Sequence, residues 1–178
     1  MNKLLFPQDI VGGSFWLISV AMIGASLFFF LERGRLSKKW NTVMTLIGVI
    51  ALMSSIHYFY AKNLWVINGQ APIAIRYIDW TLTFPLQILT FYVMLATVTD
   101  VKRGMFWRLL VGTLVWVIAQ FLGASGYMSV TLGFLIGIAG WLYIIGELYM
   151  GEAGRRNATC GNQNVQMAFF ANRLIITI

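Results

Sequence analysis

The sequence predicts an all-α membrane protein, an up-and-down bundle of transmembrane helices, and three observations carry this prediction. The chain has 178 residues, of which 59% are hydrophobic and 11% are charged, whereas soluble domains average about 45–50% apolar and about 25% charged residues. Its apolar residues form runs long enough to cross a bilayer, and short basic segments separate these runs. A soluble enzyme is excluded, because a water-soluble fold of this size has no way to bury so much apolar surface.

The other compositional signals exclude several further classes of function. The net charge is +7, but the lysines and arginines fall in clusters between apolar runs and not on one solvated face, so we expect no nucleic-acid partner. The lone Cys160 excludes an internal disulfide, and the lone His57 excludes a multi-histidine metal site. We therefore expect neither a metal centre nor an enzyme.

Stretches near 20 apolar residues place the predicted spans along the chain. The segment Met1–Val11 has no apolar core of the kind found in signal peptides, so membrane insertion depends on the first span. A sixth apolar run, Val165–Ile178, follows the polar stretch Gly154–Asn164 and stops at the chain terminus, too short to cross. We read residues 1–178 as one transmembrane domain of a longer protein. The five full spans are Gly13–Leu31, Thr42–Ala61, Pro72–Val98, Phe106–Leu122 and Met128–Met150.

The basic residues between the spans predict the orientation. On one side lie only Lys3 and Lys62, whereas the first, third and fifth connections carry most of the positive charge. By the positive-inside rule the N-terminus is external and those three connections are cytoplasmic. This predicts a multi-pass protein of the cell inner membrane. The cytoplasmic basic residues are Arg33, Arg35, Lys38, Lys39, Lys102, Arg103, Arg108, Arg155 and Arg156.

The third span carries the residues with the clearest chemical signal. An ionisable group inside a span is costly and is a functional hypothesis by default, and this span holds both an arginine and an aspartate. Polar residues recur on it at helical spacing, which predicts a single stripe facing the bundle interior. The alternative is that the threonines and the glutamine only join neighbouring helices by hydrogen bonds. The stripe consists of Arg76, Asp79, Thr83, Gln87 and Thr90.

A histidine and a carboxylate are predicted at similar depth. His57 lies near the outer end of the second span, and Asp79 lies a similar distance into the third span, which runs the opposite way. An imidazole beside a carboxylate can share a proton with it, which a proton acceptor needs. The alternative is that His57 is a hydrogen-bonded packing residue. Trp141 in the fifth span either lines a flat cofactor or fills the bundle, and we expect Glu147 to be solvated at the cytoplasmic end.

The segment Arg76–Gln87, with the sequence RYIDWTLTFPLQ, closely resembles the third helix of microbial rhodopsins, specifically of the proteorhodopsins, the retinal-dependent proton pumps of marine bacteria. The resemblance extends over nearly the whole chain. Its further motifs are Ser14–Trp16 and Phe28–Arg33 in the first span, His57–Tyr58 in the second, and Gly140–Tyr143 with Glu147–Glu152 in the fifth.

The resemblance implies a seven-helix bundle that holds all-trans-retinal on a lysine of its last helix. In that arrangement Asp79 is the Schiff-base counterion and primary proton acceptor, His57 is its partner, and Arg76 stands on the outward exit route. Trp80 and Trp141 sandwich the polyene, Thr83 lies beside the counterion, and Gln87 tunes the colour toward blue. The implied partners are the lipid bilayer, retinal and protons, with a homo-oligomer left open.

The chain departs from the family pattern at two places. Thr90 replaces the family's proton-donor carboxylate and has no proton to release at physiological pH. All five lysines lie in predicted tails or loops, so the Schiff-base lysine is absent from this chain: Lys3, Lys38, Lys39, Lys62 and Lys102. We therefore expect a partial sequence, five full helices plus the start of a sixth.

Three classes of function stay open at this point. The leading hypothesis is a light-driven outward proton pump, because the aspartate and histidine favour transport. A light-sensing rhodopsin that signals through a partner is the first alternative, because loss of the donor carboxylate suits a slow photocycle. A retinal-free membrane protein on the same scaffold is the second.

Overall fold

The computed structural model describes residues 9–70 and 73–178, and helices make up nearly all of this part of the chain. The predicted start of the third span at Pro72, and the expectations for Lys3 and most of Met1–Val11, lie outside these residues. The helices are α1 (Ile10–Glu32), α2 (Asn41–Asn68), α3 (Ile73–Ala96), α4 (Arg103–Ala124), α5 (Val130–Tyr149), α6 (Glu152–Thr159) and α7 (Gln163–Thr177), with short 3-10 turns at Arg33–Arg35 and Lys38–Trp40.

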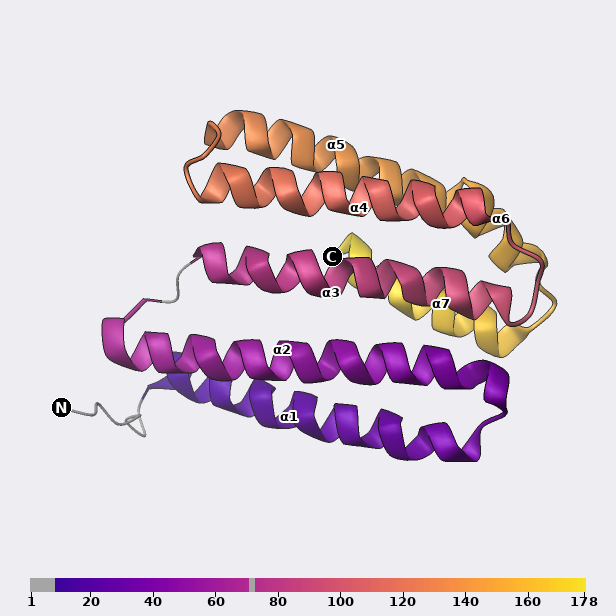
Figure 1. The fold of residues 1–178 in the computed structure, drawn as a ribbon, viewed down its shortest axis with the longest axis horizontal. Helices are drawn as coiled ribbons and strands as arrows, with labels where there is room; N and C mark the ends of the chain where they lie inside the picture. The colour runs from indigo at the N-terminus through magenta and orange to yellow at the C-terminus, as the bar shows by residue number, and fades with distance from the viewer. Residues whose placement is uncertain (1–8, 71–72) are drawn as a thin grey trace.

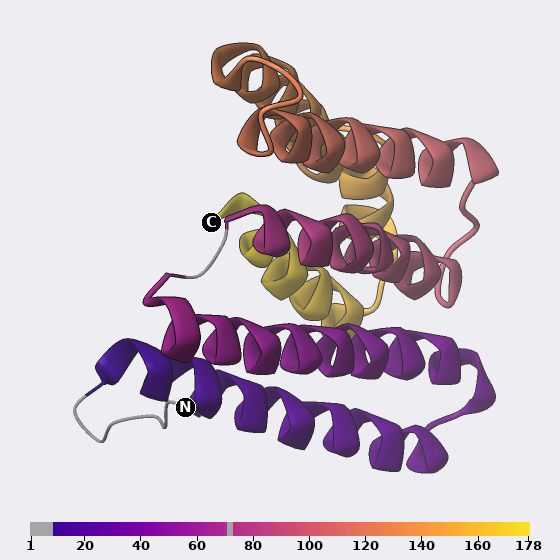
Figure 2. The ribbon, with the colours of Figure 1, turned by 60° about the vertical axis from the view of Figure 1, so that its left-hand side comes forward.

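Five of the described helices are long and apolar enough to cross a membrane. Consecutive helices run antiparallel, with α1 and α2 on one side of α3, and α4 and α5 on the other (Figure 1). α7 also packs against α3. It lies behind α3 in Figure 1 and beside it in Figure 2. The predicted all-α, up-and-down transmembrane bundle is therefore confirmed, and α3 is its central element.

The contact between α1 and α2 depends on small polar side chains. The hydroxyl of Ser19 donates to the carbonyl of Ser55 at 3.0 Å, and that of Ser26 donates to the carbonyl of Gly48 at 2.9 Å. These serines are buried, and such hydrogen bonds between helices replace the hydrophobic driving force that is missing within a lipid bilayer. They fix α2, which carries His57, against α1.

α2 is longer than predicted, because it ends at Asn68 and not at Ala61. The indole nitrogen of Trp65 donates to the Asp9 carboxylate, whose Oδ1 also accepts the Gly12 N–H at the start of α1. Gly69 then ends the helix in the left-handed region, with φ 68°, a backbone conformation that glycine adopts at no steric cost. The last two turns of α2 thus belong to the packed outer end of the bundle.

The C-terminal part also differs from the sequence expectation. The polar stretch Gly154–Asn164 was expected between spans, yet α6 occupies much of it. The sixth apolar run forms α7, capped by the Asn162 side chain, which accepts the Val165 N–H at 3.2 Å. α7 docks on α3 through the fully buried rings of Phe91 and Phe169, whose centroids are 4.9 Å apart.

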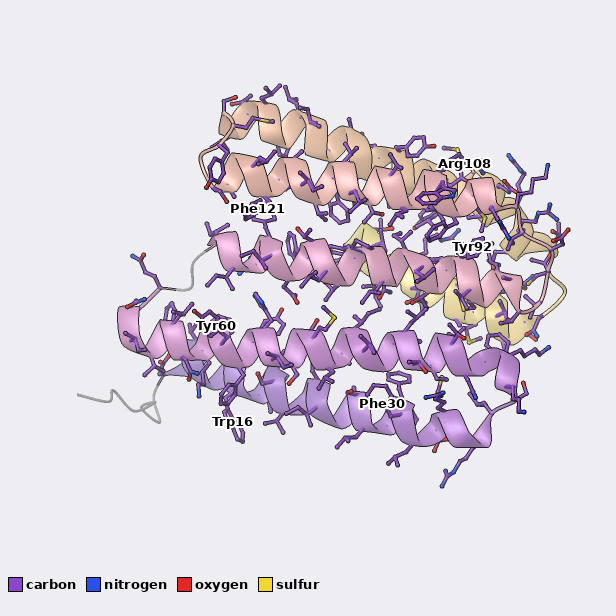
Figure 3. The ribbon with its side chains drawn as sticks, in the orientation of Figure 1. Trp16, Phe30, Tyr60, Tyr92, Arg108 and Phe121 are labelled. Carbon is purple, nitrogen blue, oxygen red and sulfur yellow. The ribbon has the colours of Figure 1, made fainter. Side chains whose placement is uncertain are left out.

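Glu147 is not solvated as the sequence predicted. Its side chain is 11% exposed, and its Oε1 accepts from Arg108 at 3.1 Å and from the backbone N–H of Glu152 at 3.0 Å. Arg108 also donates to Glu152 at 2.7 Å, and Figure 3 shows it beside α6. The two carboxylates and the guanidinium therefore join α4, α5 and α6, a contact that the fifth span alone does not reveal.

Candidate functional site

The N-terminal half of α3 faces a small cavity between α1, α2 and α3. It is called the outer half below, and the C-terminal half the inner half, after the orientation that the basic residues predict. Its volume is about 40 Å³, and both His57 and Asp79 line it. A single water needs about 10–15 Å³, so the cavity has room for a few water molecules. Asp79 is 9% exposed, and His57 lines the same cavity from α2. The remaining lining residues are Phe15, Tyr58, Ala61, Leu64, Ile75, Arg76 and Trp80.

The structure therefore brings together the two titratable groups that the sequence placed at similar depth. Counting from the predicted end of the second span was inaccurate, because α2 continues past Ala61. His57 and Asp79 still meet because α2 and α3 are antiparallel neighbours (Figure 1). An imidazole and a carboxylate that share a cavity large enough for water are able to exchange a proton through it.

The predicted polar stripe is buried for most of its length, but not at its outer end. Asp79, Thr83 and Thr90 are buried and Gln87 is half-buried. Arg76 is exposed, although it lines the same cavity as Asp79. Arg76 thus lies at the cavity that holds Asp79, and its place on an exit route stays a prediction.

A second cleft lies on the other side of Trp80. Its volume is about 410 Å³, and residues of α3, α4, α5 and α7 line it. Aromatic rings dominate its walls: the centroids of Trp80 and Phe84 are 5.5 Å apart, and those of Phe84 and Trp116 are 4.6 Å apart. The lining residues are Trp80, Phe84, Trp116, Gln120, Phe134, Ile138, Trp141 and Ile175–Ile178.

Trp80 and Trp141 both line this cleft, as a sandwich around a flat ligand requires. The indole nitrogen of Trp141 donates to the carbonyl of Ile176 at 2.9 Å, which fixes the ring relative to α7. Trp80 also lines the His57 and Asp79 cavity, so this one side chain is the wall shared by the two spaces. Thr83 lies next to them, and its hydroxyl donates to the carbonyl of Asp79 at 3.0 Å.

Gln87 lies one turn beyond Phe84 and bonds to α7. Its Nε2 donates to Oδ1 of Asn172 at 2.7 Å. Asn172 in turn lies one turn before Ile175 and Ile176, which line the cleft. The two amides therefore join α3 and α7 just beyond the inner end of the cleft, which is the helix-joining contact that the sequence left open as the alternative for this residue.

Thr90 is fully buried, and its hydroxyl donates to the carbonyl of Leu86 at 2.9 Å. The adjacent ring of Phe91 packs on Phe169 of α7. Ile88 and Leu95 on the same helix are likewise buried to 1% or less exposed surface. The inner half of α3 is therefore a dry, apolar contact, and the described residues place no carboxylate at the donor position.

The cleft fits the polyene of the chromophore that the resemblance implies, because its walls are aromatic and aliphatic. The lysines within the described segments line neither the cleft nor the cavity: Lys38, Lys39, Lys62 and Lys102. The described residues thus supply a cleft whose walls suit a polyene, but no lysine amine at that cleft for a covalent link.

Sequence reasoning missed several lining residues of the cleft. Trp116 and Gln120 lie on α4, and Phe134 and Ile138 lie on α5. The two residues on each helix are four apart and so lie on one face. Apolar spans commonly contain such aromatic or amide residues, so their presence alone does not indicate a binding site. Asn172 was missed for the same reason, because its role depends on where α7 docks.

The sequence matches known proteins over nearly its whole length. A family model described as bacteriorhodopsin-like protein matches residues 10–176. The blue-light absorbing proteorhodopsin of gamma-proteobacterium Hot 75m4 is 44% identical over 96% of this chain and 68% of its own length. The green-light absorbing proteorhodopsin of gamma-proteobacterium EBAC31A08 is 40% identical over 97% of this chain and 69% of its own.

The fold agrees with these matches. The crystal structure of the blue light-absorbing proteorhodopsin from Med12 superposes with a TM-score of 0.77 at 36% identity, over 95% of this chain and 75% of that one. The match between the family model and residues 10–176 includes the outer cavity and nearly all of the aromatic cleft. The chain belongs to the bacteriorhodopsin-like family and is a relative of the proteorhodopsins.

Proposed function

We propose that this chain forms one transmembrane domain of a retinal-dependent, light-driven outward proton pump of the inner membrane, with its N-terminus outside. Membership in the family implies a retinal chromophore. The observation that carries the proposal is the pair of spaces on either side of Trp80: the aromatic cleft, and the cavity that holds His57 and Asp79. A proton acceptor thus lies one side chain away from the chromophore site.

Retinal, when bound, supplies the light absorption and the proton whose release is driven by light. Asp79 accepts this proton, because its carboxylate faces the cavity beside Trp80. The imidazole of His57 lines the same cavity and shares the proton with the Asp79 carboxylate. Trp80 and Trp141 orient the polyene between them and exclude water from the cleft, which keeps the charges of the site in a low dielectric.

Arg76 supports the outward direction of transport. It lines the cavity together with Asp79 but is itself exposed, so a proton that leaves the carboxylate meets a fixed positive charge next to water. This positive charge favours the ionised form of the carboxylate and so promotes loss of its proton, and the shared cavity lies near the surface at which α2 ends and α3 begins. The distribution of lysines and arginines between the connections makes this the external surface.

The proposal requires an amine at the cleft, and the test therefore uses an extended chain: residues 1–178 joined to the C-terminal remainder of the blue-light absorbing relative. With retinal present, illuminated cells that carry the extended chain should acidify the medium, and a protonophore should abolish the effect. The matched control is the same extended chain with Asp79→Asn. Pumping by this control would rule out Asp79 as the acceptor.

The 178-residue chain by itself serves as a second control. Because no lysine of the described segments lines the cleft, we expect retinal to give no pigment that resists hydroxylamine and no adduct after borohydride reduction. A stable adduct on the 178-residue chain would contradict this expectation and would place the link on one of its five lysines.

A light sensor with a slow photocycle is the second candidate, and the inner half of α3 favours it. Thr90 is fully buried and its hydroxyl is bonded to its own helix, so no described group replaces the donor carboxylate. Slow recovery suits signalling through a partner. A photocycle of the extended chain that completes without net proton movement would favour the sensor.

A further inference from the structure

Arg173 is a cation within the last helix of the chain, and its environment is unusual for an arginine. Its guanidinium lies over the ring of Tyr149, 4.0 Å from the centroid, and 5.6 Å from the centroid of the Phe170 ring. The Nε atom is buried and has no hydrogen-bond partner. Cation–π contacts stabilise the charge, but they leave the N–H donors at the edge of the guanidinium without acceptors.

No carboxylate compensates this charge among residues 9–70 and 73–178. The ion pairs of these residues connect Glu32 with Arg35, and the two glutamates Glu147 and Glu152 with Arg108 and Arg156. A cation in a membrane segment is costly and nearly always has a partner. The partner of Arg173 therefore comes from outside this set of residues.

A second arginine lies at the same end of α5. Arg155 is exposed, and its Nη1 donates to the carbonyl of Met150, the residue after Tyr149. It too has no carboxylate partner in the described part of the chain. Arg173 of α7 and Arg155 of α6 thus contact consecutive residues, Tyr149 and Met150, at the end of α5, and the Arg155 charge lies at the negative end of that helix.

The surface around these two arginines is apolar. Met150 is 76% exposed, Phe170 is 49% exposed and Leu174 is 37% exposed. A free inorganic anion makes no favourable contact with such an apolar surface, whereas the acyl chains of an amphiphile bury it. Phosphate is the anion whose geometry a guanidinium recognises with two parallel hydrogen bonds.

We propose that Arg173 and Arg155, with Tyr149, Met150 and Phe170, form a binding site for the phosphate of an anionic phospholipid at the end of α5, with its acyl chains along Phe170 and Leu174. The lipid phosphate supplies the acceptor that Arg173 lacks. Its negative charge also faces two cations that no glutamate neutralises. The site joins α5 to α7, and it does not depend on the proposed pumping.

The test uses the purified 178-residue chain in a neutral detergent, with equimolar phosphatidylglycerol and phosphatidylcholine, and native mass spectrometry to count the bound lipids. We expect the first bound lipid to be phosphatidylglycerol. Arg173→Gln should lower the ratio of bound phosphatidylglycerol to phosphatidylcholine by about fivefold, which corresponds to about 1 kcal/mol per cation near an anionic lipid surface. Arg155→Gln should lower it in the same direction.

Arg33→Gln is the matched control, because Arg33 is exposed at the same membrane face and has no ion pair in the described structure. It should leave the ratio unchanged. An equal loss in Arg33→Gln, or an unchanged ratio in Arg155→Gln, overturns the site in favour of a general charge effect. Displacement of the lipid by added inorganic phosphate overturns the choice of a lipid. If circular dichroism shows that Arg173→Gln loses helix, Arg155→Gln decides alone, and an unchanged ratio in that variant contradicts the proposal.

Discussion

The outer and inner halves of α3 both carry polar residues, but one half lines a cavity and the other is closely packed. In the outer half, Asp79 faces a cavity with room for water and shares it with His57 and Arg76. In the inner half, Thr90 is fully buried beside the Phe91 and Phe169 rings. The contrast shows that the fold leaves a cavity at one end of the helix and packs the other end closely.

The neighbours of α3 explain the difference. The outer half packs against α2, which contributes the rings of His57 and Tyr58 to a loosely filled space. The inner half packs against α7, which contributes Phe169 to a dry interface. Water reaches polar groups only where packing leaves volume for it, so entry of water beside Thr90 requires movement of side chains.

The largest expected effect comes from removing the carboxylate of the outer half. In the extended chain, Asp79→Asn leaves no carboxylate in the cavity, so light-driven acidification should fall to the level seen in the dark and the pigment should absorb at longer wavelength. A pH electrode and an absorption spectrum measure the two effects. Acidification at the level of the unmodified extended chain would show that another group accepts the proton.

The next prediction introduces a carboxylate into the inner half of α3. Thr90→Glu in the extended chain places a carboxylate at the donor position, and recovery after a flash should become faster, by up to about a hundredfold for a well-placed general acid. Without it, recovery should slow as the pH rises, because protons come from bulk water. Flash spectroscopy at several pH values measures both rates.

Thr90→Val is the control for this variant, because it removes the hydroxyl and adds no acid. We expect its recovery rate to match that of the unmodified extended chain. A fast, pH-independent recovery before any substitution would mean that a different group donates the proton.

The third prediction weakens the outer half without removing its acceptor. His57→Asn removes the imidazole that shares a cavity with Asp79, and the pH midpoint of the colour change should move by about one unit, or about 1.4 kcal/mol. Spectra recorded across a pH titration give the midpoint. Tyr60→Phe is the control, since Tyr60 lies on the same helix but is exposed. Equal midpoints for His57→Asn and this control return His57 to a packing role.

The smallest expected effect lies at the boundary between the halves. Gln87→Leu should move absorption of the extended chain to longer wavelength, because it removes an amide dipole one turn from the cleft. Asn172→Leu breaks the same hydrogen bond but keeps the Gln87 amide, so its colour should change less. If Gln87 only joins the helices, both variants lose about 0.6 kcal/mol of stability and neither changes colour.

The spans and the polar stripe of α3 could be predicted from sequence, because both depend on local periodicity and on the thickness of the bilayer. The predicted end of the second span at Ala61 was wrong as the end of α2, because the polar pair Lys62 and Asn63 resembles the end of a span. The structure continues the helix to Gly69, where the pair Asn68–Gly69 is a termination signal that outweighs them.

Contacts between distant helices could not be predicted in the same way. The pairing of Gln87 with Asn172, and of Arg108 with two glutamates, joins residues far apart in the sequence. Their formation depends on how α6 and α7 fold back on the bundle, and no single-helix pattern records that geometry. The meeting of His57 and Asp79 was predictable only because α2 and α3 are consecutive and antiparallel.

Trp80 has a consequence for how such a protein adapts. Because this one ring bounds both the Asp79 cavity and the aromatic cleft, any replacement alters the volume of both at once. Under the proposed function, a substitution at this position that changes the wavelength therefore also changes the surroundings of Asp79, and compensating changes must follow elsewhere. Trp141 borders the cleft from α5, and a mutational library that separates colour from turnover should begin there.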